Sequence, residues 1–202
     1  MAKRRARTEI FLNLPYDPNY ENLFLAYICA LCAFGMIPRI TLEIPGGKRR
    51  LDRIFDLIRD CKYSVHDLSR VQLDRLKPRT PRFNMPFELG LAVGRAKTDR
   101  DRHVWFVMES MRYRLSKSLS DLNGTDPYIH DGTIEGVFRE IGNAFARKKK
   151  QPTVAQMWRI YREVRKLIGG ILKQTGAQSV FEASVFKQIS LVASTAATAI
   201  VK

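Results

Sequence analysis

One carboxylate stands out because of its surroundings. Glu88 lies in the apolar segment Met85-Pro86-Phe87-Glu88-Leu89-Gly90-Leu91-Ala92, whose pattern predicts a partly buried helix from Pro86 to about Ala96. Burial raises the pKa of a carboxylate and the positive end of a helix lowers it, so such a group can be an anion in apolar surroundings. A carboxylate of this kind can stabilise, or attack, a sugar carbon on which positive charge develops. Alternatively, Glu88 caps the backbone from about the third helical position.

Further polar side chains follow the expected strands. In an open parallel sheet, ligands bind in the crevice beyond the carboxyl ends of the strands. Asp67 is the candidate for a second acidic group, either as a proton donor or to bind sugar hydroxyls. The alternative is an aspartate that satisfies the turn after its strand. The candidate substrate-binding residues lie in loops at the same edge: Asn13, Pro15, Tyr16, Ser69, Arg82, Phe83 and Asn84.

Several of these side chains have a chemical role and a structural alternative. Tyr16 and Phe83 can stack on a heterocycle, or they can belong to the core or to a lid. Asn13 and Asn84 can bind ribose or amide groups, although asparagine in turns and caps usually bonds the backbone. The residue types alone leave both alternatives open.

The elements that must position these residues alternate between strand and helix. Apolar runs of strand length lie at residues 9–14, 37–42, 63–68 and 103–108, with a weaker one at 128–130. Apolar residues recur at helical spacing within residues 23–34, 51–58, 86–96 and 133–149. This alternation predicts an α/β domain with a five-stranded, mainly parallel sheet covered by helices on both faces.

A charge run that ends at Pro152 predicts a boundary, so we expect an α/β domain at residues 1–150 and a helical extension at 151–202. An apolar stripe from Met157 to Ile171 predicts one helix, which Gly169-Gly170 can bend. The segment Phe181–Val201 is a second helix and is so apolar that it must be covered. It either docks on the α/β domain or forms an interface with a second copy or a partner protein.

The bulk composition excludes several classes of protein. The cysteines Cys29, Cys32 and Cys61 are odd in number and sit in apolar stretches, which favours buried thiols in a reducing cytoplasm. The sequence has no Gly-rich phosphate loop of the GxGxxG or Walker type, and its histidines lack the spacing of metal ligands, so we expect no metal and no cofactor. No secretory segment and no membrane-spanning segment is expected.

The net charge of +15 comes largely from short clusters at residues 3–7, 48–50, 95–102 and 147–150. Cations gathered on one face attract polyanions, so nucleic acid or another acidic partner is one interpretation. Solvated loops and helix ends are the other.

The segment from Arg82 to Ala92 resembles the part of nucleoside deoxyribosyltransferase-like proteins in which an aromatic residue, the catalytic Glu, an apolar residue and Gly open a helix. Residues 10–16, 65–69 and 124–127 are similar to the family's first strand and substrate loop, the end of its third strand and its late loop. The resemblance spans roughly residues 8–145. It implies a flavodoxin-like three-layer fold and cleavage of an N-glycosidic bond. Related TIR-like domains, several of them bacterial antiphage effectors, use a comparable Glu to split NAD.

The chain departs from the family in the loop before the catalytic helix. That loop often carries acidic residues in the family, whereas here Lys77, Arg79 and Arg82 dominate. Arg82 and Arg50 could meet a phosphate if the substrate is a dinucleotide, although solvated loop cations are the alternative. The basic character of the loop favours an anionic substrate such as NAD over a neutral nucleoside.

The resulting hypothesis is a cytoplasmic N-glycosidase that cleaves the nicotinamide–ribose bond of NAD or a related nucleotide through Glu88. NAD is then a substrate and not a cofactor. Because uncontrolled loss of NAD would harm the cell, we expect a regulated defence effector whose C-terminal helices self-associate or bind a partner. The alternative from another class is a catalytically silent module that senses nucleotides or binds nucleic acid through a basic surface.

Overall fold

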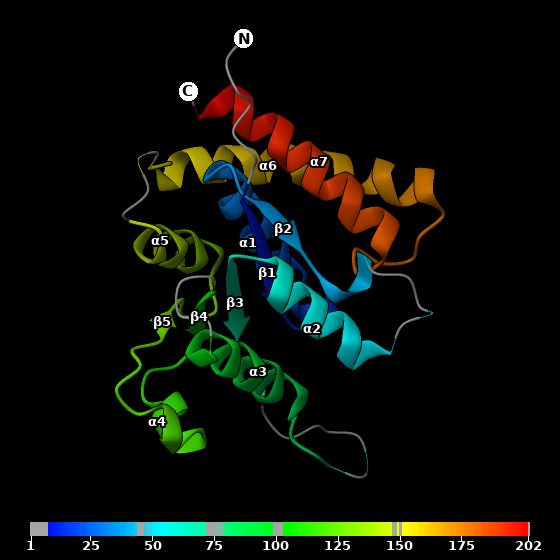
Figure 1. The fold of residues 1–202 in the computed structure, drawn as a ribbon. Coiled ribbons are helices and arrows are strands. Elements are labelled where there is room, and N and C mark those ends of the chain that lie inside the picture. The colour runs from blue at the N-terminus through cyan, green and yellow to red at the C-terminus, as the bar shows by residue number, and fades with distance from the viewer. Residues whose placement is uncertain are drawn as a thin grey trace.

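The computed structural model describes residues 8–43, 47, 49–71, 77, 79–98, 103–146, 149 and 151–201. Its centre is a sheet of five parallel strands in the order β2-β1-β3-β4-β5 (Figure 1). The strands are β1 (Glu9–Asn13), β2 (Ile37–Arg39), β3 (Tyr63–Asp67), β4 (Val104–Glu109) and β5 (Tyr128–Ile129). The prediction of an α/β, flavodoxin-like fold with a five-stranded parallel sheet is thereby confirmed.

Helices cover both faces of the sheet. On one face, α2 (Arg50–Asp60) packs beside α3 (Asn84–Thr98), and on the other lie α1 (Glu21–Ala33) and α5 (Ile134–Ala144). Side chains of a strand alternate between the faces, so in β1 Ile10 and Leu12 join the core under α1, whereas Phe11 joins the core under α2 and α3. Both faces of β1 are therefore buried.

Short elements complete the connections. They are the 3-10 turns η1 (Pro18–Tyr20), η2 (Thr41–Glu43) and η3 (Ser120–Leu122) and the five-residue helix α4 (Arg114–Ser118). The second strand was expected to reach Leu42 but ends at Arg39, because the Glu43 carboxylate accepts a hydrogen bond of 2.8 Å from the backbone N–H of Ile40. This bond turns the chain into η2.

The C-terminal extension consists of α6 (Val154–Thr175) and α7 (Ala183–Ile200), which pack against each other and against α1. Their buried residues belong to the same continuous core as those of α1 and β1. The structure therefore has the extension docked on the α/β domain, one of the two arrangements expected. No break occurs at Gly169-Gly170, where α6 continues as one helix.

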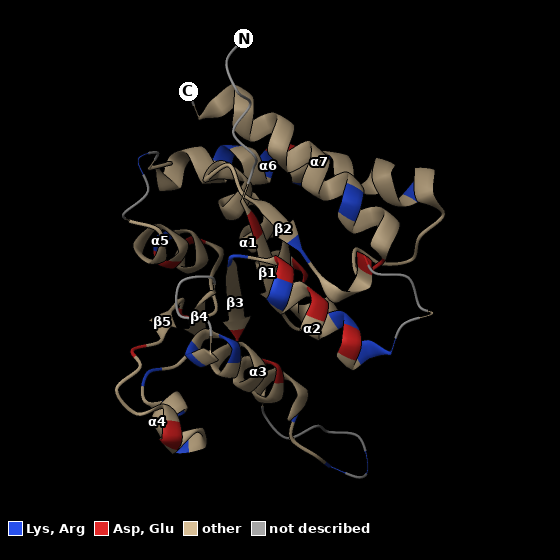
Figure 2. Cartoon of the chain, in the orientation of Figure 1, with Lys and Arg blue, Asp and Glu red and all other residues tan. Residues whose placement is uncertain are grey.

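α7 is the apolar segment that was expected to need cover. Val185, Phe186 and Ile189 on one side of it are buried, while Leu191 on another side is 62% exposed. In length and apolar composition, α7 also meets the criteria for a membrane-spanning helix. Figure 2 shows how few charges it carries. The cover on α7 is thus partial.

Candidate active site

The candidate site lies at the carboxyl end of the sheet, where β1 and β3 are neighbours. Asn13, the last residue of β1, stands beside His66 in β3. The chain leaves β1 toward β2 on one side and leaves β3 toward β4 on the other, so the connecting loops diverge there. That divergence is where open α/β sheets form ligand crevices.

Glu88 projects from α3 and is only 2% exposed. Its single polar contact among the described residues is with Arg50 at the start of α2, where Glu88 Oε1 and Arg50 Nη2 are 3.5 Å apart. Oε1 accepts no hydrogen bond from any residue in the described ranges. Burial raises the pKa of Glu88 to about 7, because the partly exposed guanidinium of Arg50 lowers it less than the loss of water raises it.

The capping alternative for Glu88 does not match the geometry of α3. The helix begins at Asn84, two residues earlier than expected, so Glu88 is its fifth residue and not its third. The first helical hydrogen bond joins the Phe87 N–H to the Phe83 carbonyl. The Glu88 carboxylate accepts no backbone N–H bond within the described part of the chain, so it does not cap the helix.

Tyr16 belongs to the same group of side chains. Its hydroxyl lies 3.1 Å from the hydroxyl of Thr41. Burial raises the pKa of Tyr16 to about 12, and the charges of Glu88 and Arg50 both act on it. Tyr16, Arg50 and Glu88 come from a loop and two different helices, and together they place a neutral hydroxyl, a cation and a buried carboxylate at one edge of the sheet.

Asp67 occupies a different kind of environment, although it ends the neighbouring strand. Its Oδ2 accepts hydrogen bonds from the hydroxyls of Tyr20 and Tyr27, the latter at 2.7 Å, and lies 3.1 Å from His130 Nε2. Its Oδ1 accepts the backbone N–H of Ser69 at 2.8 Å. Burial alone would raise the pKa of Asp67, but these partners outweigh it and lower the pKa to about 2.

This geometry favours the structural alternative for Asp67. A carboxyl group that stays ionised at neutral pH is no proton donor, and one that is fully buried with both oxygens bonded is not placed to grip a sugar. Asp67 instead ties β3 to α1 and to the chain after β5.

Asn13 also serves the fold. Its amide donates to the carbonyl of Met85 in α3 at 3.1 Å and to His66 Nδ1 at 3.0 Å. His66 Nε2 then carries the proton and donates to Ser64 Oγ at 2.8 Å, and that hydroxyl bonds His103 Nε2 at 2.9 Å. Burial lowers the pKa of His66 to about 3, so the chain of bonds is neutral. Asn13 thereby holds the first turn of the helix that carries Glu88.

The remaining candidate residues divide into buried and accessible ones. Pro15 and Ser69 are buried, and Ser69 lines a polar cavity of about 420 Å³ that Arg70 also lines. Arg82 contacts Asp17 with 3.4 Å between Nη2 and Oδ2. Phe83, which is 69% exposed, and Asn84 lie on the surface at the start of α3. Phe83 and Asn84 are thus open to solvent, Ser69 faces a cavity, and Arg82 is accessible but paired with Asp17.

Sequence reasoning missed the partners of the two carboxylates. Arg50 was considered only as a phosphate ligand, and its contact with Glu88 depends on how α2 packs beside α3. Tyr20 and Tyr27 are seven residues apart, a helical spacing that places them on one side of the chain, and this could have signalled a shared partner. His130 lies 63 residues after Asp67, and no local pattern links them.

The candidate site as described offers carboxylate chemistry. Within the described ranges no group of His, Cys, Asp and Glu side chains could hold a metal ion, and the three cysteines are free and buried. The basic clusters at residues 3–7 and 99–102 lie outside the described residues. No protein-family model matches this chain, and no curated protein does either.

Proposed function

We propose that this protein is an N-glycosidase that cleaves the nicotinamide–ribose bond of NAD or a related nucleotide, with Glu88 as its catalytic carboxylate. The observation that carries the proposal is the state of Glu88: it is buried at the carboxyl edge of the sheet and, among the residues that the structure describes, its Oε1 accepts no hydrogen bond and contacts one cation. A carboxylate that stabilised only the fold would be bonded, as Asp67 is.

The reaction needs little more than such a carboxylate. The bond between C1′ and the nicotinamide nitrogen breaks, and its electron pair neutralises the cationic ring, which leaves as a neutral molecule. Positive charge develops on the ribose, where ionised Glu88 stabilises it. Water then adds to C1′ and loses a proton, so the products are nicotinamide, ADP-ribose and H⁺.

The state of Asp67 supports NAD over an ordinary nucleoside. Purine and pyrimidine bases leave poorly unless an acid protonates them, and the low pKa of Asp67 makes it unfit for that task. Nicotinamide needs no such proton. The Arg82 side chain and the cavity beside Arg70 add cations at the same sheet edge, which suits the phosphates of a dinucleotide.

The C-terminal helices are a route for regulation. The ring of Phe181, just before α7, lies 5.9 Å from the ring of Tyr16 and 5.1 Å from that of Phe24. An apolar groove between α6 and α7, with Leu167 and Leu191 exposed, suits a second copy of the chain. Self-association there would affect the position of Tyr16 in the candidate site through its contact with Phe181. Such coupling is expected of a cytoplasmic effector that stays inactive until it assembles.

The test is to incubate the full chain with NAD over a range of protein concentrations and to follow nicotinamide and ADP-ribose by chromatography. Glu88→Gln is expected to reduce base release by at least about 10²-fold. Asp60→Asn, which removes an exposed carboxylate at the far end of α2, serves as the matched control and should leave the rate unchanged. Equal rates for the native chain and Glu88→Gln would refute the role of Glu88.

The net charge of +15 favours a second candidate, a silent module that binds nucleic acid. A gel shift with short DNA and RNA that weakens as salt rises, without any base release from NAD, would support it.

A further inference from the structure

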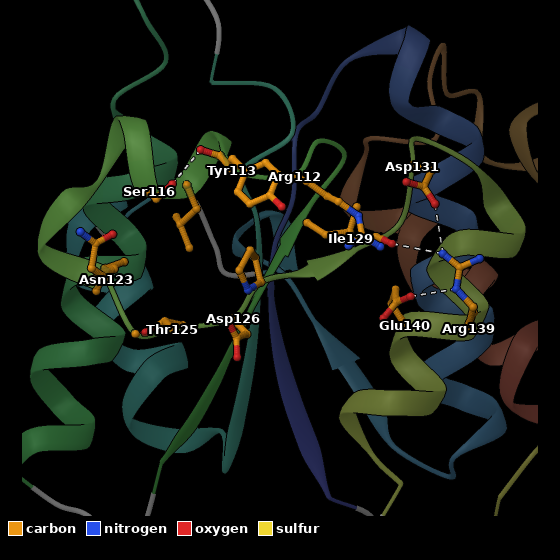
Figure 3. Close-up of a pocket in the computed structure, with 14 residues that line it drawn as sticks. Arg112, Tyr113, Ser116, Asn123, Thr125, Asp126, Ile129, Asp131, Arg139 and Glu140 are labelled. Carbon is orange, nitrogen blue, oxygen red and sulfur yellow. Dashed lines mark hydrogen bonds and ion pairs between the residues drawn. The ribbon is translucent and has the colours of Figure 1, made fainter.

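A second pocket lies away from Glu88, at the β5 edge of the sheet. It has a volume of about 600 Å³, within the range of small-molecule sites, and it opens between α4 with η3 on one side and α5 on the other (Figure 3). Its lining does not include Glu88, Tyr16 or Arg50. Any ligand bound there is therefore separate from the proposed reaction.

The charged groups on the α5 side of this pocket pair with one another. Arg139 pairs with Asp131 at 3.1 Å and with Glu140 at 2.8 Å, and it donates to the Ile129 carbonyl at 3.2 Å. Figure 3 shows these groups turned toward one another. These charged groups on the α5 side of the pocket therefore compensate one another.

The rest of the pocket is different, because its charged side chains pair with no residue that the structure describes. Within the described part of the chain, the side chains of Arg112, Asn123 and Asp126 make no hydrogen bond or ion pair, although all three line the pocket. In Figure 3, Arg112 lies along one rim and Asp126 across from it. A guanidinium, an amide and a carboxylate thus line one pocket without bonding each other.

Tyr113 completes this set with an aromatic surface. It is 76% exposed and takes a left-handed backbone conformation, with φ of 63°, that a residue other than glycine rarely adopts. The segment is clamped on both sides, because Arg114 bonds the buried Glu109 at 2.6 and 2.5 Å and Glu109 also accepts the Ser110 N–H. The backbone that carries the exposed ring is therefore anchored at the pocket mouth.

We propose that this pocket is a second nucleotide site, which takes a purine nucleoside monophosphate. The ring of Tyr113 offers a stacking surface for the base. The Asp126 carboxylate and the Asn123 amide match the amino and carbonyl groups on the edge of a purine, and the Arg112 guanidinium binds the phosphate. A nucleotide supplies all three chemistries at once, and the volume accommodates one.

The experiment is a calorimetric titration of the full chain with GMP, AMP, guanosine, adenosine and inorganic phosphate. At least one monophosphate is expected to bind, and its nucleoside to bind at least tenfold more weakly. Tyr113→Gly should weaken monophosphate binding at least tenfold without lowering the melting temperature, because glycine suits the left-handed backbone there. Arg112→Gln should bring the monophosphate down to the affinity of the nucleoside, while Lys117→Gln, an equal charge change on the exposed face of α4, should have no effect.

Glu88→Gln separates this proposal from the proposed function, since it should leave monophosphate binding intact even where base release is lost. Absence of binding by both monophosphates overturns the second site. So does binding that survives both Tyr113→Gly and Arg112→Gln, which would locate the nucleotide elsewhere.

Discussion

Asp67 and Glu88 are two buried carboxylates at the same end of one sheet, and their surroundings are opposite. Asp67 accepts hydrogen bonds from two tyrosines and a backbone N–H and contacts a histidine, whereas Glu88 contacts one arginine at 3.5 Å. The pKa of Asp67 falls to about 2 and that of Glu88 rises to about 7. Burial acts on both groups in the same direction, so the difference comes from the partners.

The comparison separates a carboxylate that stabilises the fold from one that the fold must accommodate. A buried anion with full hydrogen bonding holds elements together, and a buried anion without it lowers stability. Proteins retain the second kind where it has a task, because catalytic groups need shifted pKa values and active sites cost stability. The two residues should therefore respond to neutralisation with opposite signs.

The largest expected effect is that of Asp67→Asn. The amide cannot accept from Tyr20, Tyr27 and Ser69 together in either orientation, so at least one buried donor loses its partner, and we expect a loss of about 3–5 kcal/mol at pH 7. Chemical denaturation measures this loss. The Asp67 pKa lies below the value of an unfolded chain, so its stabilisation is present above about pH 4 and disappears as the pH falls through about 2. A variant as stable as the native chain at pH 7 would show that the tyrosine bonds contribute little.

Glu88→Gln should have the opposite sign. The pKa of Glu88 is raised, so native Glu88 lowers stability as the pH rises from about 4.5 through about 7. The neutral amide avoids that cost, and we expect a gain of about 2–3 kcal/mol at pH 8 that vanishes near pH 4. Denaturation at both pH values tests this. A loss of stability at both would instead assign Glu88 a structural role like that of Asp67.

The sequence alone was sufficient for the architecture. Strand-length runs, such as those that contain Phe11-Leu12 and Val65-His66, alternate with segments whose apolar residues recur at helical spacing. That alternation leaves few arrangements other than a parallel sheet. The early end of β2 was not predictable, because it depends on one bond from the Ile40 N–H to the Glu43 carboxylate. α4 was missed because five residues give no clear period.

The site was predictable as a location and less so as a set of roles. Glu88 was identified because a carboxylate is rare in an apolar helix. Asn13 and Asp67 lie at the carboxyl ends of their strands as predicted, but whether they face a ligand or the protein depends on partners such as Met85 and His130, which are distant in sequence. Residue type and strand ends predict where polar groups gather, and packing decides which of them remain free.

The rate of base release should follow the ionisation of Glu88, whose pKa is raised, and not that of Asp67, whose pKa is lowered. If ionised Glu88 is the active form, kcat/KM should fall about tenfold for each pH unit below about 7 and level off above it. Initial rates of nicotinamide release from pH 5 to 9 measure this profile. An acid limb near pH 4 or lower would assign the activity to a carboxylate with an ordinary or lowered pKa.

The smallest expected effect concerns Arg50, the cation that distinguishes Glu88 from a wholly unpartnered carboxylate. Its positive charge lowers the pKa of Glu88, so Arg50→Gln should move the acid limb of the rate profile to higher pH. The Arg50 side chain is 55% exposed, and water screens its charge, so the shift should be roughly half a pH unit. Arg49→Gln makes the same charge change one residue earlier, on an exposed side chain. An equal shift in both variants would mean that the general positive charge of the α2 terminus sets the pKa of Glu88. A shift in Arg50→Gln alone would mean that the single contact at 3.5 Å sets how much of Glu88 is ionised at neutral pH.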